Sequence, residues 1–326
     1  MATLDQALSR APDYVGAYGN KGDVLRSLGD LLARLSRHQE VEETYNDAVT
    51  AFDAALDRAP DDIYAYNNKG VALRALGDLL VRLSRHEEAE ETYNDAVATL
   101  DQALSRAPDD IYAYSNKGAA LRSLGDLLAA VSRHVEAEGA YADAVDTLDQ
   151  ALSRAPDYVE AYSNKGATLR SLGDLLVSLI RYEEAEGALT DAVAALDEAL
   201  RRAPGDPRLH GSKGIALRGH GDLLANLSRY EEAEEAFSDA AAAFDEVLRR
   251  APEDTDVHFL KAVTLLSQGD CVRVLGAREH VVYALWEEAQ RHAEHILDLV
   301  PQQEHAVSLL AQIRDWLDTL DDSSQG

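Results

Sequence analysis

The stretch Asp61–Pro108 decides the fold, and it reads DDIYAYNNKGVALRALGDLLVRLSRHEEAEETYNDAVATLDQALSRAP. Close copies of it fill most of the 326-residue chain, and an Ala-Pro pair closes each copy. The closing prolines are 48 residues apart and lie at Pro12, Pro60, Pro108, Pro156, Pro204 and Pro252. A fixed period of this size is typical of proteins built from stacked structural repeats.

The copies divide the chain into four regions. Residues 1–12 match the end of a copy, since Ala2–Pro12 is identical to Ala98–Pro108. The other regions are five full copies at 13–252, a degenerate copy at 253–301, and an expected capping helix with a polar tail at 302–326.

Apolar residues within a copy recur at helical spacing. One stripe consists of Leu73, Leu76, Leu80 and Leu83. A second stripe runs from Ala89 to Leu104, and Pro108 ends it. Asp61 or Asp109, directly after a proline, is expected to cap the next helix. Each copy therefore predicts a hairpin of two helices of roughly 20 residues. Because no strand pattern is present, we predict an all-α fold, an α-solenoid of antiparallel helix hairpins.

The opening and close of each copy resemble the tetratricopeptide repeat. Tyr66-x2-Lys69-Gly70-x2-Leu73 is similar to the start of that family's pattern, and Ala96-x3-Leu100 followed by Pro108 is similar to its end. The resemblance implies a right-handed superhelix whose first helices line a concave face that binds an extended peptide or a partner's helix. A helix pair of the HEAT type, with a period of roughly 40–47 residues, is the alternative.

The copies exceed the family's period of about 34 residues by two heptads. Leu76-Gly77-Asp78 is echoed seven residues later by Leu83-Ser84-Arg85, and Ala89-x3-Tyr93 by Ala96-x3-Leu100. Seven residues nearly complete two helical turns, so one added heptad in each helix keeps the buried face. Gly77 then falls inside the first helix, where we expect it to allow close packing or a slight bend.

The resemblance places a recurring asparagine on the concave face, where it would bind peptide backbone. A carboxamide both donates and accepts hydrogen bonds, which suits that task. Hydrogen bonds within its own helix or to the neighbouring repeat are the alternative. The predicted peptide-binding asparagines are Asn20, Asn68, Asn116 and Asn164, with Tyr64 and Tyr112 nearby by helical phase.

Recurring arginines are also candidates for peptide binding. Each lies four residues before an aspartate, so an ion pair along the helix competes with contact to an acidic ligand. The predicted residues are Arg26, Arg74, Arg122 and Arg170. The recurring lysines, such as Lys69, are expected to extend along packed helices away from the concave face.

The net charge of −28 argues against nucleic acid as a partner. Charge is segregated between the two helices of a copy: Ile63–Arg85 carries +3, whereas His86–Arg106 carries −5. This pattern predicts a neutral-to-basic groove inside an acidic outer wall. An acidic protein or extended peptide is therefore the predicted partner.

The sequence favours a non-catalytic protein that needs no cofactor. It has no glycine-rich phosphate loop and no HExxH motif. His292 and His295 could form a metal site with Glu288, but surface histidines are commoner, and no metal is predicted. Cys271, the single cysteine, is expected to pack in the core. Without a signal peptide or an apolar run of membrane-spanning length, a cytoplasmic protein that does not bind membranes is expected.

The predicted function is that of a binding scaffold or adaptor acting through its concave groove. Two alternatives remain open at this point. The N-terminal partial repeat leaves an apolar face through which copies could stack end to end or form dimers. The chain could also be a sensor or regulatory module of a larger multidomain protein.

Overall fold

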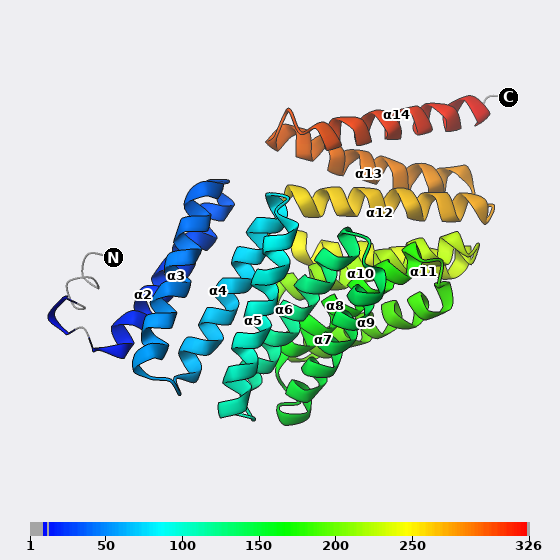
Figure 1. Ribbon diagram of the computed structural model, residues 1–326. Helices are drawn as coiled ribbons and strands as arrows, with labels where there is room; N and C mark the ends of the chain where they lie inside the picture. Colours follow the sequence, from blue (N-terminus) through cyan, green and yellow to red (C-terminus); the bar gives the residue numbers. More distant parts are fainter. Residues whose placement is uncertain (1–8, 12, 325–326) are drawn as a thin grey trace. The chain divides into compact units, whose positions relative to one another are not determined.

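The computed structural model describes residues 9–11 and 13–324, with side chains up to residue 317 (Figure 1). The described residues form thirteen α-helices and no strand. The predicted partial repeat at 1–12 lies mostly outside the described residues. The helices are α2 (Val15–Arg34), α3 (His38–Arg58), α4 (Ile63–Arg82), α5 (His86–Arg106), α6 (Ile111–Ala130), α7 (His134–Arg154), α8 (Val159–Ser178), α9 (Tyr182–Arg202), α10 (Pro207–Asn226), α11 (Tyr230–Leu248), α12 (Thr255–Val274), α13 (Glu279–Leu299) and α14 (Glu304–Ser324).

The chain divides into two compact units, Met1–Ser171 and Leu172–Gly326, with the boundary inside α8. Within each unit, consecutive helices pair as hairpins, for example α4 with α5 and α10 with α11 (Figure 1). Each hairpin helix is 19 to 21 residues long. The predicted all-α fold of helix hairpins is confirmed.

A three-residue turn joins the two helices of a hairpin. In Leu83-Ser84-Arg85, Ser84 adopts a left-handed φ of 59°. The N–H groups of Ser84 and Arg85 donate to the carbonyl oxygens of Val81 and Leu80 at 2.9 Å, which satisfies the carbonyls that the helix end leaves free. This geometry stops α4 and reverses the chain into α5.

In α4 and α6 the capping aspartate lies one position later than predicted. The side chain of Asp62 accepts from the backbone N–H of Ala65 at the start of α4, and Asp110 does the same at α6. Because these helices begin at Ile63 and Ile111, only the second aspartate after the proline can reach the N–H groups of the first turn.

Glycines on the first helix make room for large side chains of the second. A Cβ atom on Gly77 would lie 2.5 Å from the ring of Tyr93, and one on Gly70 would lie 2.6 Å from Leu100. The predicted close packing is confirmed. Both members of each pair recur seven residues apart, so this packing runs through the added heptads. Further pairs are Gly22 with Phe52, Gly29 with Tyr45, Gly118 with Leu148, Gly125 with Tyr141, Gly214 with Phe244, and Gly221 with Phe237.

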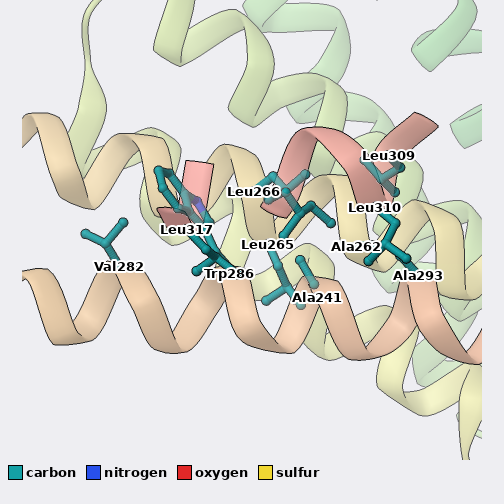
Figure 2. Close-up of a cluster of buried hydrophobic side chains, with 12 residues drawn as sticks. Ala241, Ala262, Leu265, Leu266, Val282, Trp286, Ala293, Leu309, Leu310 and Leu317 are labelled. Atoms are coloured by element: carbon teal, nitrogen blue, oxygen red, sulfur yellow. The ribbon is translucent and has the colours of Figure 1, made fainter. Parts of the chain in front are cut away.

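The C-terminal helix closes the core of the second unit. Figure 2 shows its leucines pointing at side chains of α12 and α13. The rings of Trp286 and Trp316, the two tryptophans of the chain, lie 5.3 Å apart between centroids. Members of this cluster include Leu265, Leu266, Val282, Trp286, Ala293, Leu309, Leu310 and Leu317.

Candidate functional site

The first helices of neighbouring hairpins form the inner face of each unit. Within the first unit α2 contacts α4 and α4 contacts α6, and within the second α10 contacts α12. The first helices α4, α6, α10 and α12 also pack against the second helix of the preceding hairpin, as α4 does against α3. Because neighbouring first helices approach one another, they lie on the concave side of each unit.

A pocket of about 340 Å³ opens on this face between α2 and α4. Three arginines and two aspartates line it, so its charge is slightly positive. The lining residues are Asp30, Ala33, Arg34, Tyr45, Arg74, Ala75, Asp78 and Arg82.

Arg74 and Asp78 of this pocket belong to a hydrogen-bonded triad. Arg74 donates to one carboxylate oxygen of Asp78 at 2.9 Å, and the hydroxyl of Tyr93 donates to the other at 2.7 Å. Burial and the charge of Asp78 raise the pKa of Tyr93. The same triad forms from Arg26, Asp30 and Tyr45 and from Arg122, Asp126 and Tyr141. The ion pair that competes with ligand contact is therefore present at these arginines.

The next pocket, between α4 and α6, has a volume of about 300 Å³. It shares Asp78 and Arg82 with the first pocket, so the two form one stripe along the inner face. Its remaining charged residues are Arg122 and Asp126. Neither Arg34 nor Arg82 forms an ion pair with a carboxylate that the structure describes. These two guanidinium groups therefore remain available to an anionic group.

The equivalent pocket of the second unit has the opposite charge. It lies beside α10, α11 and α12, has a volume of about 350 Å³, and is lined by Asp222 and Asp270 without any arginine or lysine. Asn226 and Val274 occupy the positions that correspond to Arg34 and Arg82 in the repeat. The two pockets of the first unit are thus neutral to slightly positive, whereas this pocket is acidic and differs from the predicted neutral-to-basic groove.

Comparison with known proteins identifies the repeat. The family model described as tetratricopeptide repeat matches residues 32–97 and 235–272. The structure of BtubC from P. vanneervenii superposes with a TM-score of 0.56 at 17% identity, and the match covers 74% of this chain and 85% of BtubC. The chain therefore contains tetratricopeptide repeats in these two segments.

Other solved structures resemble this chain with its tetratricopeptide repeats (TPRs). Acl4, described as the assembly chaperone of RpL4, has a TM-score of 0.51 at 14% identity over 94% of this chain and 99% of Acl4. A thermophilic TPR protein of Thermus thermophilus has a TM-score of 0.42 at 21% identity, covering 75% of this chain and 99% of its own. At these identities the likeness concerns the fold alone. No curated protein matches the chain in sequence.

Two of the predicted peptide-binding asparagines of the chain bond within the structure. Asn68 donates to the carbonyl oxygen of Tyr64 in its own helix at 3.0 Å, and Asn164 donates to the hydroxyl of Ser115 in the preceding repeat at 3.0 Å. Both alternatives to peptide binding, a hydrogen bond within the helix and one to the neighbouring repeat, therefore occur. Asn20 is exposed and Asn116 is half-buried. Binding of peptide backbone by these four residues stays a prediction.

The two predicted tyrosines lie on the surface and contact the neighbouring repeat. The hydroxyl of Tyr64 donates to Asp23 of α2, and this hydrogen bond raises the pKa of Tyr64 to about 12. The ring of Tyr112 meets Tyr158 edge-on, with centroids 5.7 Å apart. Arg170, the last predicted arginine, donates to the hydroxyl of Ser171 at 3.5 Å.

The recurring lysines bridge neighbouring repeats. Lys69 of α4 contacts Asp53 of α3 at 2.6 Å, and Lys117 contacts Asp101 in the same way. These lysine side chains, which were expected to extend along packed helices, therefore end in ion pairs. The sequence contains a signal for it, since each lysine follows an aspartate by 16 residues.

The candidate histidines belong to a polar network. His292 lies 2.7 Å from His258 between their Nδ1 atoms, and Lys261 bonds to Glu288 at 2.8 Å. Within the described ranges, no group of three or more His, Cys, Asp or Glu side chains is arranged to hold a metal ion. Cys271 is buried in an apolar cluster, as predicted, and burial raises the pKa of its thiol to about 11.

Among the residues with a defined position, no helix is both long enough and apolar enough to cross a membrane.

Proposed function

We propose that this chain is a non-catalytic, cytoplasmic protein-binding scaffold whose inner face holds an extended segment of an acidic partner. The observation that carries this proposal is the arginine stripe of the first unit. Arg34 and Arg82 line adjoining pockets and have no ion-pair partner among the described carboxylates. Carboxylate side chains of a bound segment would supply that partner, and guanidinium groups pair with carboxylates in a bidentate geometry.

Micromolar binding of a peptide requires contacts from the arginines as well as from the asparagines. Four asparagine hydrogen bonds of about 0.5–1.5 kcal/mol each contribute roughly 2–6 kcal/mol. Micromolar affinity needs about 8 kcal/mol. Hydrogen bonds to charged groups contribute about 1.5–3 kcal/mol each, so two arginine–carboxylate contacts close the difference.

In this proposal the asparagines bind peptide backbone and the arginines bind side chains. Because Asn68 and Asn164 also bond inside the protein, their replacement would affect stability as well as binding. The double variant Asn20→Ala/Asn116→Ala is therefore the better test of backbone binding. We expect it to weaken peptide binding without lowering the midpoint of urea denaturation.

Fluorescence anisotropy tests the arginine stripe. The probes are a labelled peptide with spaced glutamates and a matched peptide with glutamines. Replacing both Arg34 and Arg82 by Gln should weaken binding of the glutamate peptide by about tenfold or more, which corresponds to about 1.4 kcal/mol. The control, Arg201→Gln/Arg249→Gln, removes the same charge from two exposed ion pairs of the second unit. Equal loss in both variants, or equal binding of the two peptides, would contradict the proposal.

A second candidate function is self-association through α2. Its outer face exposes an apolar stripe with 38% to 59% of each side chain accessible. The corresponding residues of α4, such as Leu76 and Leu79, are buried against α3. A second copy of the chain could cover the stripe in the same manner. The exposed residues are Val24, Leu28, Leu31 and Leu35.

A further inference from the structure

The pocket that contains Asp222 and Asp270 differs from its counterparts in more than charge. Apolar and aromatic side chains form its walls, including Tyr230, Phe237 and Val274. Its volume of about 350 Å³ is sufficient for the end of a long side chain. Two carboxylates therefore face one partly apolar pocket whose lining includes no cation.

Asp222 lacks a hydrogen bond that its counterparts in the first unit have. In the first unit the two oxygens of Asp78 accept from Arg74 and from the hydroxyl of Tyr93. Asp222 accepts from Arg218 at 3.3 Å, but the tyrosine is replaced by Phe237, which has no hydroxyl to donate. Burial raises the pKa of Asp222. A donor from a ligand would therefore restore a missing hydrogen bond and stabilise the charged carboxylate.

Asp270 is also weakly compensated. The arginine that precedes the equivalent aspartate in each full copy is replaced by Leu266. Asp270 instead pairs with Arg273 at 3.1 Å, and the side chain of Arg273 is 56% exposed. An exposed ion pair of this kind contributes little, since water screens it.

A partly apolar cavity, whose polar lining includes His305, Ser308 and Gln312, adjoins this pocket. It has a volume of about 400 Å³, lies between α12 and α14, and shares Ser267 and Asp270 with the first pocket. Its apolar walls include Phe259, Leu309 and Trp316. The carboxylate of Asp270 thus lies at the boundary between the acidic pocket and this cavity.

We propose that the acidic pocket accepts the ammonium or guanidinium group of a lysine or arginine side chain of a protein partner, while an adjacent apolar side chain of the same segment enters the adjoining cavity. Charge complementarity carries this choice, because the two carboxylates offer acceptors and the lining offers no competing cation. The inference goes beyond the function proposed above, which concerns acidic segments and the other unit. The two can therefore fail independently.

The single cysteine of the chain provides a direct measurement, because Cys271 lines the acidic pocket. We would compare its reaction rates with two methanethiosulfonates, the cationic aminoethyl reagent and the anionic sulfonatoethyl reagent. The cation-to-anion rate ratio, divided by that of glutathione, should be about ten or more. The variant Asp222→Asn/Asp270→Asn should lower this ratio severalfold.

A matched variant controls for the net charge of the chain. Asp146→Asn/Asp239→Asn removes the same charge from two exposed helix positions and should keep the wild-type ratio. A wild-type ratio close to that of glutathione would overturn the proposal without reference to any variant. So would equal ratios in the two variants, or a thiol that reacts with neither reagent.

Protection of Cys271 by short peptides tests the occupant. The probes are the blocked tripeptides Leu-Arg-Leu, Leu-Glu-Leu and Ala-Arg-Ala. We expect Leu-Arg-Leu to slow labelling by the cationic reagent at lower concentration than either of the others. Equal protection by Leu-Glu-Leu would exclude recognition of the basic side chain, and equal protection by Ala-Arg-Ala would exclude the contribution of the adjoining cavity.

Discussion

At the scale of single residues, one hairpin turn holds a side chain that does not suit its backbone. Ile180 has a left-handed φ of 61° and is 72% exposed, whereas the equivalent residues of the other turns are four serines and Gly276. A β-branched side chain is strained in this conformation, at a cost of about 1–2 kcal/mol. Ile180→Asn should therefore raise the free energy of unfolding by about 1 kcal/mol, measured by urea denaturation. The converse change, Ser132→Ile, should lower it by a similar amount. A stabilising Ser132→Ile would contradict this account of the turn.

A histidine pair, one buried and one half-buried, should make stability depend on pH. Burial lowers the pKa of His292 to about 4 and also lowers that of His258, and the charge of Lys261 adds to the effect on both. The other charged or titratable groups that act on the pair are Glu288, Asp245, Asp254 and His295. Because an unfolded histidine has a pKa of about 6.5, the unfolded chain binds more protons between this value and about 4. The free energy of unfolding should fall as the pH is lowered through this range, by about 1.4 kcal/mol per pH unit for each proton.

Urea denaturation at several pH values measures this dependence. His292→Gln should reduce the loss of stability between neutral and mildly acidic pH. The matched variant His280→Gln, at an exposed position of α13, should behave like the wild type. If both variants lose stability as steeply as the wild type, the pair is not the cause.

At the scale of helices, the fit between glycine and a large side chain sets the packing within each hairpin. A Cβ atom on Gly77 would overlap the ring of Tyr93, so Gly77→Ala should destabilise the protein by about 1–3 kcal/mol. Gly139 also lies inside a helix, α7, but a Cβ atom there would meet nothing within 4 Å. Gly139→Ala should therefore stabilise the protein by up to about 1 kcal/mol, because alanine favours helix. Denaturation midpoints that shift in the same direction would contradict this explanation.

At the scale of the whole molecule, the exposed stripe of α2 predicts concentration-dependent association. Light scattering should show an apparent mass that rises with concentration for the wild type and stays monomeric for Leu31→Glu. Val135→Glu is the control, because Val135 is 85% exposed on α7 and lies outside the stripe. A wild type that remains monomeric at all concentrations would exclude this function.

The sequence predicts the hairpins well because they depend on local spacing. The stripe that includes Leu73 and Leu76 and the turn at Ser84 are readable within one copy. Contacts between helices are harder to predict, since the bond from Tyr93 to Asp78 joins residues 15 apart whose side chains meet only after the hairpin closes. For the same reason, the sequence alone does not identify Arg82 as a binding residue.

Because an arginine recurs at its position in every full copy, Arg74 is predicted to bind peptide. In the structure it pairs with Asp78 within its own helix. Arg82 occurs only in the second copy and, as Arg34, in the first, so the repeat pattern gave it no weight. Its place in two adjoining pockets follows from the way α2, α4 and α6 stack. The feature that distinguishes the repeats from one another is therefore the one that carries the proposed binding.

Photo-crosslinking tests the central claim, that the inner face of the first unit binds acidic segments, most directly. The probe is the peptide with spaced glutamates, carrying one benzophenone group, and mass spectrometry identifies the crosslinked residues. We predict crosslinks to the pocket walls on α2 and α4, at Ala33, Ala75 and Val81, and their loss in Arg34→Gln/Arg82→Gln. Crosslinks confined to the outer helices α3, α5 and α7 would contradict the claim.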